Sequence, residues 1–223
     1  MFRRIVLAVL FSIFTFCANP MLAQDEWRKL LNGKDMDGWE QIGIGGFTVQ
    51  PDGSYKSHDG LGMLVYTKEK LGNCRLRVSY KLEALNMNGG VHFRASDFHV
   101  KDGFAFADQS YEIQIWSRED DLHCTGSVYS FSRVLARPYS ETDWNEMEIW
   151  MIGPRTIVWI NHIKVNDYLD GTPLDPGRRP RDIKPGPRPN VGYIALQNHQ
   201  DINNVKQFIY YKDVMVAPLP PGF

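Results

Sequence analysis

The chain has 223 residues and a formal net charge of −1, and 43% of its residues are hydrophobic. That length allows one substantial hydrophobic core and predicts a single domain behind an N-terminal leader. The near-zero charge argues against a nucleic-acid-binding protein, which needs a stripe of basic residues.

The first 23 residues have the pattern of a secretory signal peptide. Arg3 and Arg4 form a basic start, and residues 5–16 form an apolar run that is too short to span a bilayer. We predict cleavage after Ala23, which leaves a periplasmic or secreted domain of residues 24–223. This mature chain is expected to have no stable membrane span.

Two alternatives to cleavage at that point stay open. Cys17 allows a lipoprotein, although Phe16 stands where lipoprotein signals carry a small residue. Met21 is larger than the residue usually found three positions before a cleavage site, and an uncleaved anchor is the second alternative.

Beyond the leader, strand patterns recur and helical patterns are nearly absent. No segment keeps apolar residues at helical spacing for more than a turn or two, and residues 25–31 could form one short turn. Many strands without crossover helices predict an antiparallel sandwich or barrel, with a meander over residues 144–165. The predicted strands are 46–49, 64–67, 74–82, 90–94, 111–116, 126–131, 144–152, 156–160, 163–165, 193–197 and 208–216.

A long segment late in the chain interrupts this pattern. Residues 169–190 contain six prolines in 22 residues and must be mostly irregular. Loops of that length are often lids or binding loops, and an insertion without a role is the alternative. Its basic residues are interpreted as parts of a solvated loop rather than an anion site: Arg178, Arg179, Arg181, Lys184 and Arg188.

The predicted strand over residues 111–116 has two chemically different faces. Side chains alternate along a strand, so its tyrosine and isoleucines share one face while Glu112, Gln114 and Trp116 share the other. A carboxylate and an amide supply directional hydrogen bonds, and an indole supplies a flat apolar surface. That set suits a sugar ring, which has hydroxyls on its edge and C–H groups on its face.

Two further strands repeat the arrangement. His92 and Arg94 share the polar face of one, and Gln197 and His199 share the polar face of the other. We expect the three polar faces to belong to one sheet and to form a groove. Three separate solvent-exposed faces are the alternative.

Cys74 and Cys124 are the cysteines that remain after cleavage. A secreted protein could pair them. Cys74 also shares an apolar strand face with Leu76, so a buried free thiol is an equal alternative.

Seven short segments carry a family resemblance through their order and spacing: residues 30–39, 88–94, 111–115, 125–129, 144–145, 158–161 and 192–199. Over nearly its full length the mature chain resembles the 3-keto-disaccharide hydrolase domain family, also described as 3-keto-glucoside lyase and hydratase proteins. The resemblance implies a bacterial exported protein with an all-β fold, a concanavalin-like jelly-roll sandwich of two antiparallel sheets. Departures from the family pattern occur at Val91, His92, Trp116 and Gln200.

The resemblance also implies a chemistry, the cleavage of glycosides or oligosaccharides in which one sugar is oxidised at carbon 3. A ketone there acidifies the C2 hydrogen, so that loss of this proton can expel the leaving group at C1. Addition of water then completes a net hydrolysis. Such an enzyme needs a base near C2, stabilisation of the enolate at C3 and an acid for the leaving oxygen.

For this family chemistry, Glu112 and His199 are the candidates for proton transfer, because a groove carboxylate and an imidazole can both titrate near working pH. Arg94 could stabilise the enolate or pair with Glu112. The side chains expected to bind substrate are Gln114, Trp116, His92, Gln197 and Trp144.

No cofactor is required by this scheme. A divalent metal held by Glu112, His92 or His199 could stabilise the enolate instead, although the sequence has no closely spaced ligand motif. The competing interpretation is a non-catalytic carbohydrate-binding module that uses Trp116 and Trp144 as stacking platforms, and a structural envelope domain is the third.

Export gives the first testable prediction. Mass spectrometry of the mature protein should find an N-terminus near Gln24, because the basic start and the apolar run direct the chain to a signal peptidase. A cytoplasmic protein that still begins at Met1 would contradict it.

Overall fold

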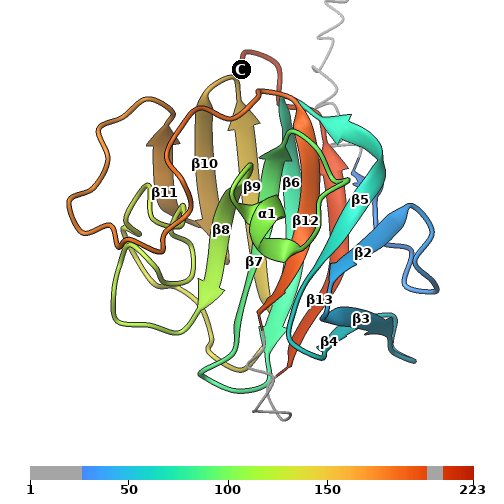
Figure 1. Cartoon of the computed structure of the whole chain (residues 1–223). Helices are drawn as coiled ribbons and strands as arrows, with labels where there is room; N and C mark the ends of the chain where they lie inside the picture. The colour runs from blue at the N-terminus through green and yellow to red at the C-terminus, as the bar shows by residue number, and fades with distance from the viewer. Residues whose placement is uncertain (1–26, 200–207) are drawn as a thin grey trace, which may run out of the picture.

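The computed structural model describes residues 27–199 and 208–223, and it consists of two antiparallel β-sheets packed face to face (Figure 1). This is the all-β sandwich that the strand-rich sequence predicts. The one α-helix within those residues is α1, Gly103–Ala107. The predicted leader, its cleavage point and Gln200 lie outside the described residues.

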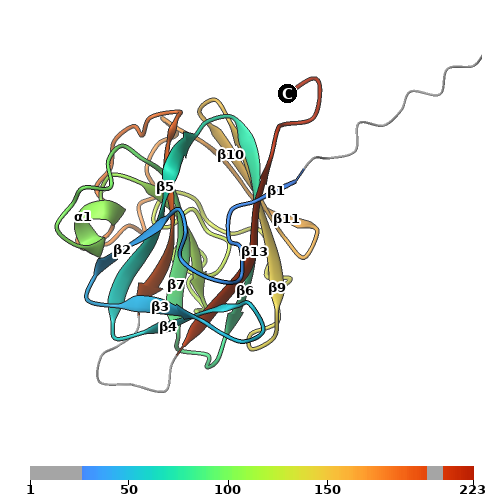
Figure 2. The ribbon, with the colours of Figure 1, turned by 90° about the vertical axis from the view of Figure 1, so that its right-hand side faces the viewer.

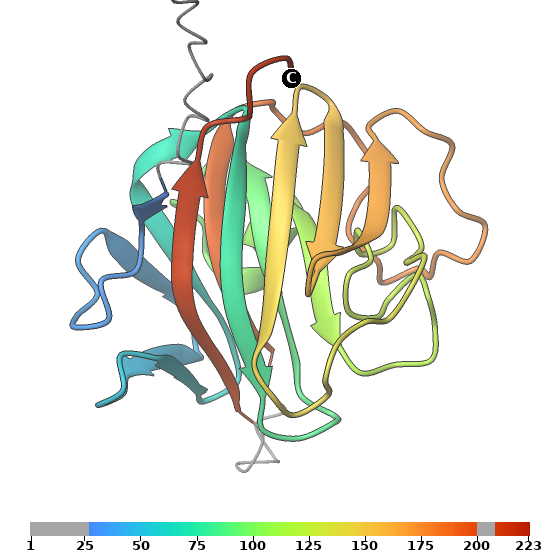
Figure 3. The ribbon, with the colours of Figure 1, turned by 180° about the vertical axis from the view of Figure 1, so that it is seen from behind.

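The larger sheet has eight strands: β1 (Arg28–Lys29), β3 (Gly46–Val49), β4 (Tyr55–His58), β6 (Cys74–Leu82), β9 (Asn145–Ile152), β10 (Arg155–Ile160), β11 (Ile163–Leu169) and β13 (Ile209–Ala217). Their order is β11-β10-β9-β6-β13-β4-β3, with β1 paired to β13 (Figure 3). The predicted meander is present as β9, β10 and β11. The turn expected over residues 25–31 is instead partly strand, because β1 pairs with the end of β13.

The smaller sheet has five strands: β2 (Trp39–Gly43), β5 (Leu61–Leu71), β7 (Asn88–Ala95), β8 (Tyr111–Trp116) and β12 (Gly192–His199). Their order is β2-β5-β12-β7-β8, and every pair is antiparallel. All three strands with a predicted polar face therefore lie side by side in one sheet. The expected common sheet is confirmed.

The main core lies between the two sheets and forms as the alternation predicts. The apolar faces of β7, β8 and β12 all point into it, through Val91, Ile113 and Leu196 among others, and these three side chains are fully buried. Burying a side chain of this size stabilises the fold by roughly 1.5–3 kcal/mol. The alternating polar residues are thereby directed to the outer face of the smaller sheet.

A β-bulge near the end of β7 breaks this alternation. Arg94 has a φ of 59°, and the pairing with β12 shifts register beside it, between Tyr193 and Ala195. An extra residue in one strand reverses the side on which the following side chains emerge. Ala95 accordingly packs in a cluster on the outer face, whereas a regular strand would have placed Arg94 there.

The outer face of the smaller sheet has a cover of its own. Residues 96–110, which include α1, pack over it on the side away from the larger sheet (Figure 2). Asp102 caps α1 by accepting a hydrogen bond from the backbone N–H of Ala105 at 2.9 Å. Phe106 then completes a small second hydrophobic cluster with Met63, Val65, Ala95 and Ala195.

The proline-rich segment 169–190 is irregular, as expected, but its arginines are not all solvated. Arg188 donates hydrogen bonds to the backbone carbonyls of Asp108 and Ser110, at 2.9 and 3.1 Å. Arg178 and Arg179 are also half-buried and bonded to the body of the domain. The solvated-loop interpretation was therefore wrong for these three, which pin the segment to the sandwich.

The two cysteines are buried and unpaired. Burial raises the pKa of the Cys74 thiol to about 12 and that of Cys124 to about 11, so both stay protonated and unreactive at neutral pH. In residues 27–199 and 208–223, no helix is long and apolar enough to cross a membrane.

Candidate functional site

The strand register arranges the outer face of the smaller sheet in rows. His92 on β7 pairs with Glu112 on β8, and Ala195 on β12 pairs with His92 from the other side. Two residues further along, Gly90 lies between Gln197 and Gln114. A third row holds Asn88 opposite Trp116, with His199 bonded to Asn88.

Glu112 occupies an unusual position for a carboxylate. Its side chain is only 3% exposed, and its Oε1 atom has no hydrogen-bond partner in the described structure. Burial raises its pKa from an ordinary 4.5 to about 8, because the charged form is poorly solvated there. The carboxyl group thus titrates close to neutral pH.

Gly90 makes room for this carboxyl group. A Cβ atom built on Gly90 would lie 2.4 Å from Oε1 of Glu112, well inside contact distance. Gly90 is therefore required by the close approach of Glu112, and it leaves a gap in the middle row between Gln114 and Gln197.

His92 is a fully buried neighbour of Glu112 with a defined hydrogen-bond role. Its Nδ1 lies 2.8 Å from the hydroxyl of Ser110, which itself donates to the carbonyl of Phe106. Because that hydroxyl proton is used, we infer that Nδ1–H of His92 donates to Ser110, which leaves Nε2 as an acceptor for the amide of Gln197 at 3.1 Å.

The electrostatics agree with a neutral His92. Burial lowers its pKa to about 3. Its Nε2 atom lies 3.8 Å from Oε2 of Glu112, too far for a hydrogen bond. The row therefore presents an uncharged imidazole beside a carboxyl group that can be charged or neutral.

Three buried oxygen atoms on this face lack hydrogen-bond partners in the described structure: Asn88 Oδ1, Glu112 Oε1 and Gln197 Oε1. A buried acceptor without a donor costs roughly 1–3 kcal/mol. Sugar hydroxyls are donors that could satisfy all three. The outer face thus has acceptors that could take hydrogen bonds from a ligand.

Trp116, Tyr129 and His199 lie on the same face and are half-exposed. The guanidinium of Arg118 lies over the Trp116 indole, 4.2 Å from the centre of the ring. The ring of Phe104, from α1, stacks edge-on against His199 at 5.9 Å. Burial lowers the pKa of His199.

Glu112 and His199 share this face but are not neighbours. His199 contacts Asn88, four residues along β7 from the His92 that pairs with Glu112. Strand spacing and rise then place the two Cα atoms roughly 16 Å apart. The titratable side chain adjacent to Glu112 on β7 is His92.

Two predicted site residues lie elsewhere, and their placement in the groove was wrong. The β-bulge turns Arg94 away from the outer face, and its guanidinium bonds the carbonyl of Gly153 in the turn between β9 and β10. Trp144 precedes β9 in the larger sheet, where Lys81 and Lys212 cover its ring. Period-two alternation tells which side chains of a strand share a face. It does not tell which sheet the strand joins or where a bulge interrupts the strand.

Sequence reasoning missed Tyr129. Residues 126–131 were predicted as a strand and are irregular, yet part of the segment pairs with β8: Tyr129 N–H donates to the carbonyl of Glu112 at 2.9 Å. The predicted alternation within 126–131 would have placed Tyr129 on the face opposite Val128, which is in the core. The alternation of Val128 and Tyr129 is therefore the sequence signal that indicates the outward orientation of Tyr129.

A metal site does not assemble from the predicted ligands. Within the described ranges, no group of three or more His, Cys, Asp or Glu side chains is arranged to hold a metal ion. Glu112 and His92 are neighbours, but His199 is far from both, and the orphan oxygens of Asn88 and Gln197 are neutral.

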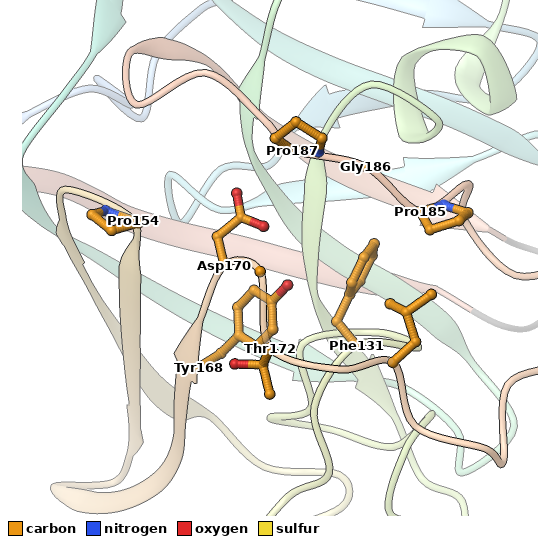
Figure 4. A pocket seen from close by; sticks show the side chains of 10 residues that line it. Phe131, Pro154, Tyr168, Asp170, Thr172, Pro185, Gly186 and Pro187 are labelled. Atoms are coloured by element: carbon orange, nitrogen blue, oxygen red, sulfur yellow. The ribbon is translucent and has the colours of Figure 1, made fainter.

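A cavity of about 540 Å³ opens elsewhere, at the edge of the sandwich between residues 168–174 and 185–187. Figure 4 shows Asp170 among Pro154, Tyr168 and Phe131. Its lining holds one carboxylate, one phenol and one threonine hydroxyl among apolar side chains and glycines, without a counterpart of the buried Glu112–His92 pair. We therefore place the candidate active site on the outer face of the smaller sheet.

Comparison with known proteins agrees with this fold and these motifs. Residues 26–217 match the family described as the 3-keto-alpha-glucoside-1,2-lyase-like domain. The chain belongs to this family. The resemblance that the seven sequence segments carry is thus confirmed, and the protein is a lyase-like domain over nearly its full length. A search of curated protein sequences finds no match.

Solved structures show the same fold at low sequence identity. Two proposed glycosyl hydrolases from Parabacteroides distasonis align with TM-scores of 0.69 and 0.66, at 19% and 22% identity. The alignments cover 86% and 87% of this chain and 94% and 100% of theirs. A Bacillus subtilis carbohydrate-binding module aligns with a TM-score of 0.52 at 12% identity, over 81% of this chain and 95% of its own. The lyase-like domain therefore has the same β-sandwich fold as these proteins.

The buried carboxyl group predicts a pH-dependent stability. Between about pH 4.5 and 8, Glu112 is protonated when folded and ionised when unfolded, so the free energy of unfolding should fall as pH rises. Glu112→Gln should flatten this fall and be more stable than wild type at pH 8, with the difference shrinking toward pH 5. Urea denaturation at several pH values measures it.

The exposed Glu40→Gln variant is the matched control and should keep the wild-type slope. The lowered pKa of His92 also makes the free energy of unfolding depend on pH, but only below pH 6.5. This contribution is the same in wild type, Glu112→Gln and Glu40→Gln. Equal slopes in wild type and Glu112→Gln would show that Glu112 does not titrate as described.

Proposed function

We propose that this protein cleaves the glycosidic bond next to a sugar oxidised at carbon 3, with Glu112 as the base that removes the C2 proton. The observation that carries the proposal is the buried Glu112 carboxyl group with one unpartnered oxygen. Membership of the lyase-like family supports the choice of substrate class.

The reaction begins with ionised Glu112. Its carboxylate takes the C2 proton, the C2–H electron pair forms the C2=C3 bond of an enolate, and the C3 oxygen becomes negative. The enolate then re-forms the ketone as the C1–O bond breaks, which leaves a double bond between C1 and C2. The leaving oxygen takes a proton from the Glu112 carboxylic acid or from water, and later addition of water to the double bond gives net hydrolysis.

The neighbouring side chains suit the remaining tasks. The free oxygens of Gln197 and Asn88 can accept hydrogen bonds from sugar hydroxyls. Because His92 is neutral, it places no positive charge beside Glu112, and the pKa of Glu112 stays high. His199, at the far end of the polar face, is assigned to the leaving sugar rather than to the ring that loses its proton.

Export completes the proposal. A protein that meets 3-keto-glycosides outside the cytoplasm would need the signal peptide predicted for residues 1–23. The periplasmic or secreted location is part of the proposed function and is tested by the N-terminus of the mature protein.

Release of the aglycone from a 3-keto-glucoside tests the role of Glu112. We expect Glu112→Gln to lower kcat by at least about a hundredfold, the usual contribution of a general acid or base. For wild type, kcat/KM should rise about tenfold per pH unit and level off above about pH 8, where Glu112 is ionised. Glu40→Gln is the control.

The assay also separates the catalytic interpretation from the binding one. Full turnover by Glu112→Gln would remove this residue from the reaction. A wild-type protein that binds 3-keto-glucosides without ever releasing aglycone would instead be a carbohydrate-binding module.

Trp116 gives a prediction for substrate binding. Its half-exposed indole can pack on the C–H face of a sugar, so Trp116→Ala should raise KM several-fold and change kcat less. Trp144→Ala is the matched control, because Trp144 lies with the larger sheet and should leave KM unchanged. Equal effects of the two substitutions would place the substrate elsewhere.

A further inference from the structure

The proposed elimination leaves one requirement without a residue. Negative charge develops on the C3 oxygen when the C2 proton leaves, and a positioned donor must stabilise it. Arg94, the predicted donor, is in the interior with its guanidinium on Gly153. The donor must therefore be sought among the other side chains around Glu112.

Tyr129 lies directly across from Glu112. Val128 forms an antiparallel bridge with Ile113, and Gln114 N–H donates to the carbonyl of Ser127 at 3.1 Å. The segment thus extends the smaller sheet beyond β8 by a few residues. Val128 points into the core, so Tyr129 points to the outer face, in the same row as Glu112.

Arg179 holds the hydroxyl group of Tyr129. Its Nη2 donates to the phenol oxygen at 2.8 Å. Within residues 27–199 and 208–223, the Tyr129 hydroxyl donates no hydrogen bond of its own to a protein group, so its proton is available to a ligand. A cation bonded to the phenol oxygen makes that O–H a stronger donor.

A partly buried chain of charged and polar side chains fixes Arg179. Asp182 accepts hydrogen bonds from the backbone N–H of Arg179 at 2.7 Å and from its Nε at 3.2 Å. His123, which is fully buried, bridges Asp182 at 3.0 Å and Asp120 at 2.6 Å through its two ring nitrogens. The imidazole of His123 thus joins the two carboxyl groups into one hydrogen-bonded chain.

The hydrogen-bonded chain of Asp120, His123 and Asp182 also contacts Tyr129 itself. The His123 ring packs edge-on against the Tyr129 ring at 5.0 Å. Two irregular segments, 117–135 and 169–190, are thereby joined at the side of β8 next to Glu112. The buried members of such a chain, His123 and Asp182, cost stability unless they are paired, and here the pairing holds one arginine and one tyrosine in place.

We propose that Tyr129 is a catalytic residue whose hydroxyl donates a hydrogen bond to the C3 oxygen of a 3-keto sugar, and that Arg179, held by the Asp120–His123–Asp182 chain, is its positioning residue. The inference rests on the proposed function. As Glu112 takes the C2 proton, the enolate oxygen gains charge and its hydrogen bond from Tyr129 strengthens. No proton leaves Tyr129 in this step, so the balance of the elimination is unchanged.

The protonation state of Tyr129 agrees with a donor role. Burial raises the pKa of Tyr129 to about 12, with a further contribution from Glu112, although Arg179 opposes the rise. The phenol is therefore protonated over the whole pH range in which Glu112 becomes ionised. Glu112 as base and Tyr129 as donor are available together at pH 8.

The test compares Tyr129→Phe with wild type on a 3-keto-glucoside. We expect kcat to fall about a hundredfold, the usual loss for one donor to an oxyanion, with KM changed less than threefold. The pH dependence set by Glu112 should stay in place. Tyr210→Phe, in the larger sheet, is the control for removing a hydroxyl and should match wild type.

A second measurement isolates the enolate. A 3-keto sugar without a leaving group at C1, such as a 1,5-anhydro-3-ketohexitol, can only lose and regain its C2 proton. NMR in deuterium oxide should show C2 exchange catalysed by wild type and slowed in Tyr129→Phe by the same factor as kcat. A phenylalanine variant that exchanges as fast as wild type would overturn the role of Tyr129.

Arg179 is tested through its half-exposed side chain, since a substitution of buried His123 endangers folding. Arg179→Gln should slow C2 exchange at least tenfold, and Arg179→Lys, which keeps the charge, should recover part of the loss. Arg155→Gln, which removes an exposed ion pair with Asp167, is the control. Unchanged exchange in Arg179→Gln would remove Arg179 from the mechanism.

The outcomes distinguish the inference from the proposed function. If wild type acts on 3-keto-glucosides and Tyr129→Phe acts equally well, the inference fails and the proposed function stands. If wild type neither releases aglycone nor exchanges the C2 proton of any 3-keto sugar, the proposed function fails and the inference fails with it.

Discussion

The pairing register between β7 and β8 is the constraint on which the site depends. It sets His92 against Glu112 and puts Gly90 diagonally beside them, where the missing side chain admits the carboxyl group. A shift by one residue would send Glu112 into the main core and Ile113 to the outer face. The apolar faces of both strands exclude that shift, so the packing of the core specifies the arrangement of the polar groups.

The burial of Glu112 affects both the stability of the fold and the pKa of this carboxyl group. Glu112 is held where its charge is poorly solvated, and its own Oε1 and two further oxygen atoms on the same face lack partners in the described structure. The sandwich can carry this cost because a large apolar core lies directly behind the polar face. A substrate that supplies hydroxyl donors would bond to these oxygen atoms. It would thereby offset part of the poor solvation that raises the pKa of Glu112.

Much of this could be predicted from the sequence, because period-two alternation and turn residues determine strands and their faces. Glu112, Gln114 and Gln197 are where alternation places them. Arg94 is not, because a bulge is a property of two paired strands and one strand does not reveal it. Trp144 is not, because alternation does not tell which sheet a strand joins.

Tyr129 shows a different limit. It lies in an irregular segment, and its importance comes from contacts with Arg179 and His123 that are distant in sequence. The short strands β2 and β4 were missed for a related reason, since so few residues carry little periodic signal. Tyr129, β2 and β4 take their places in the structure through pairing with residues distant in sequence, rather than through local propensity.

The small cluster beneath α1 has a consequence for how this protein can change. It rests on five buried side chains and is separate from the main core between the sheets. Residues 96–110 therefore form a unit whose opening or replacement would leave most of the apolar interior covered. Selection can alter this segment over the polar face, while the sandwich that sets the strand register remains intact.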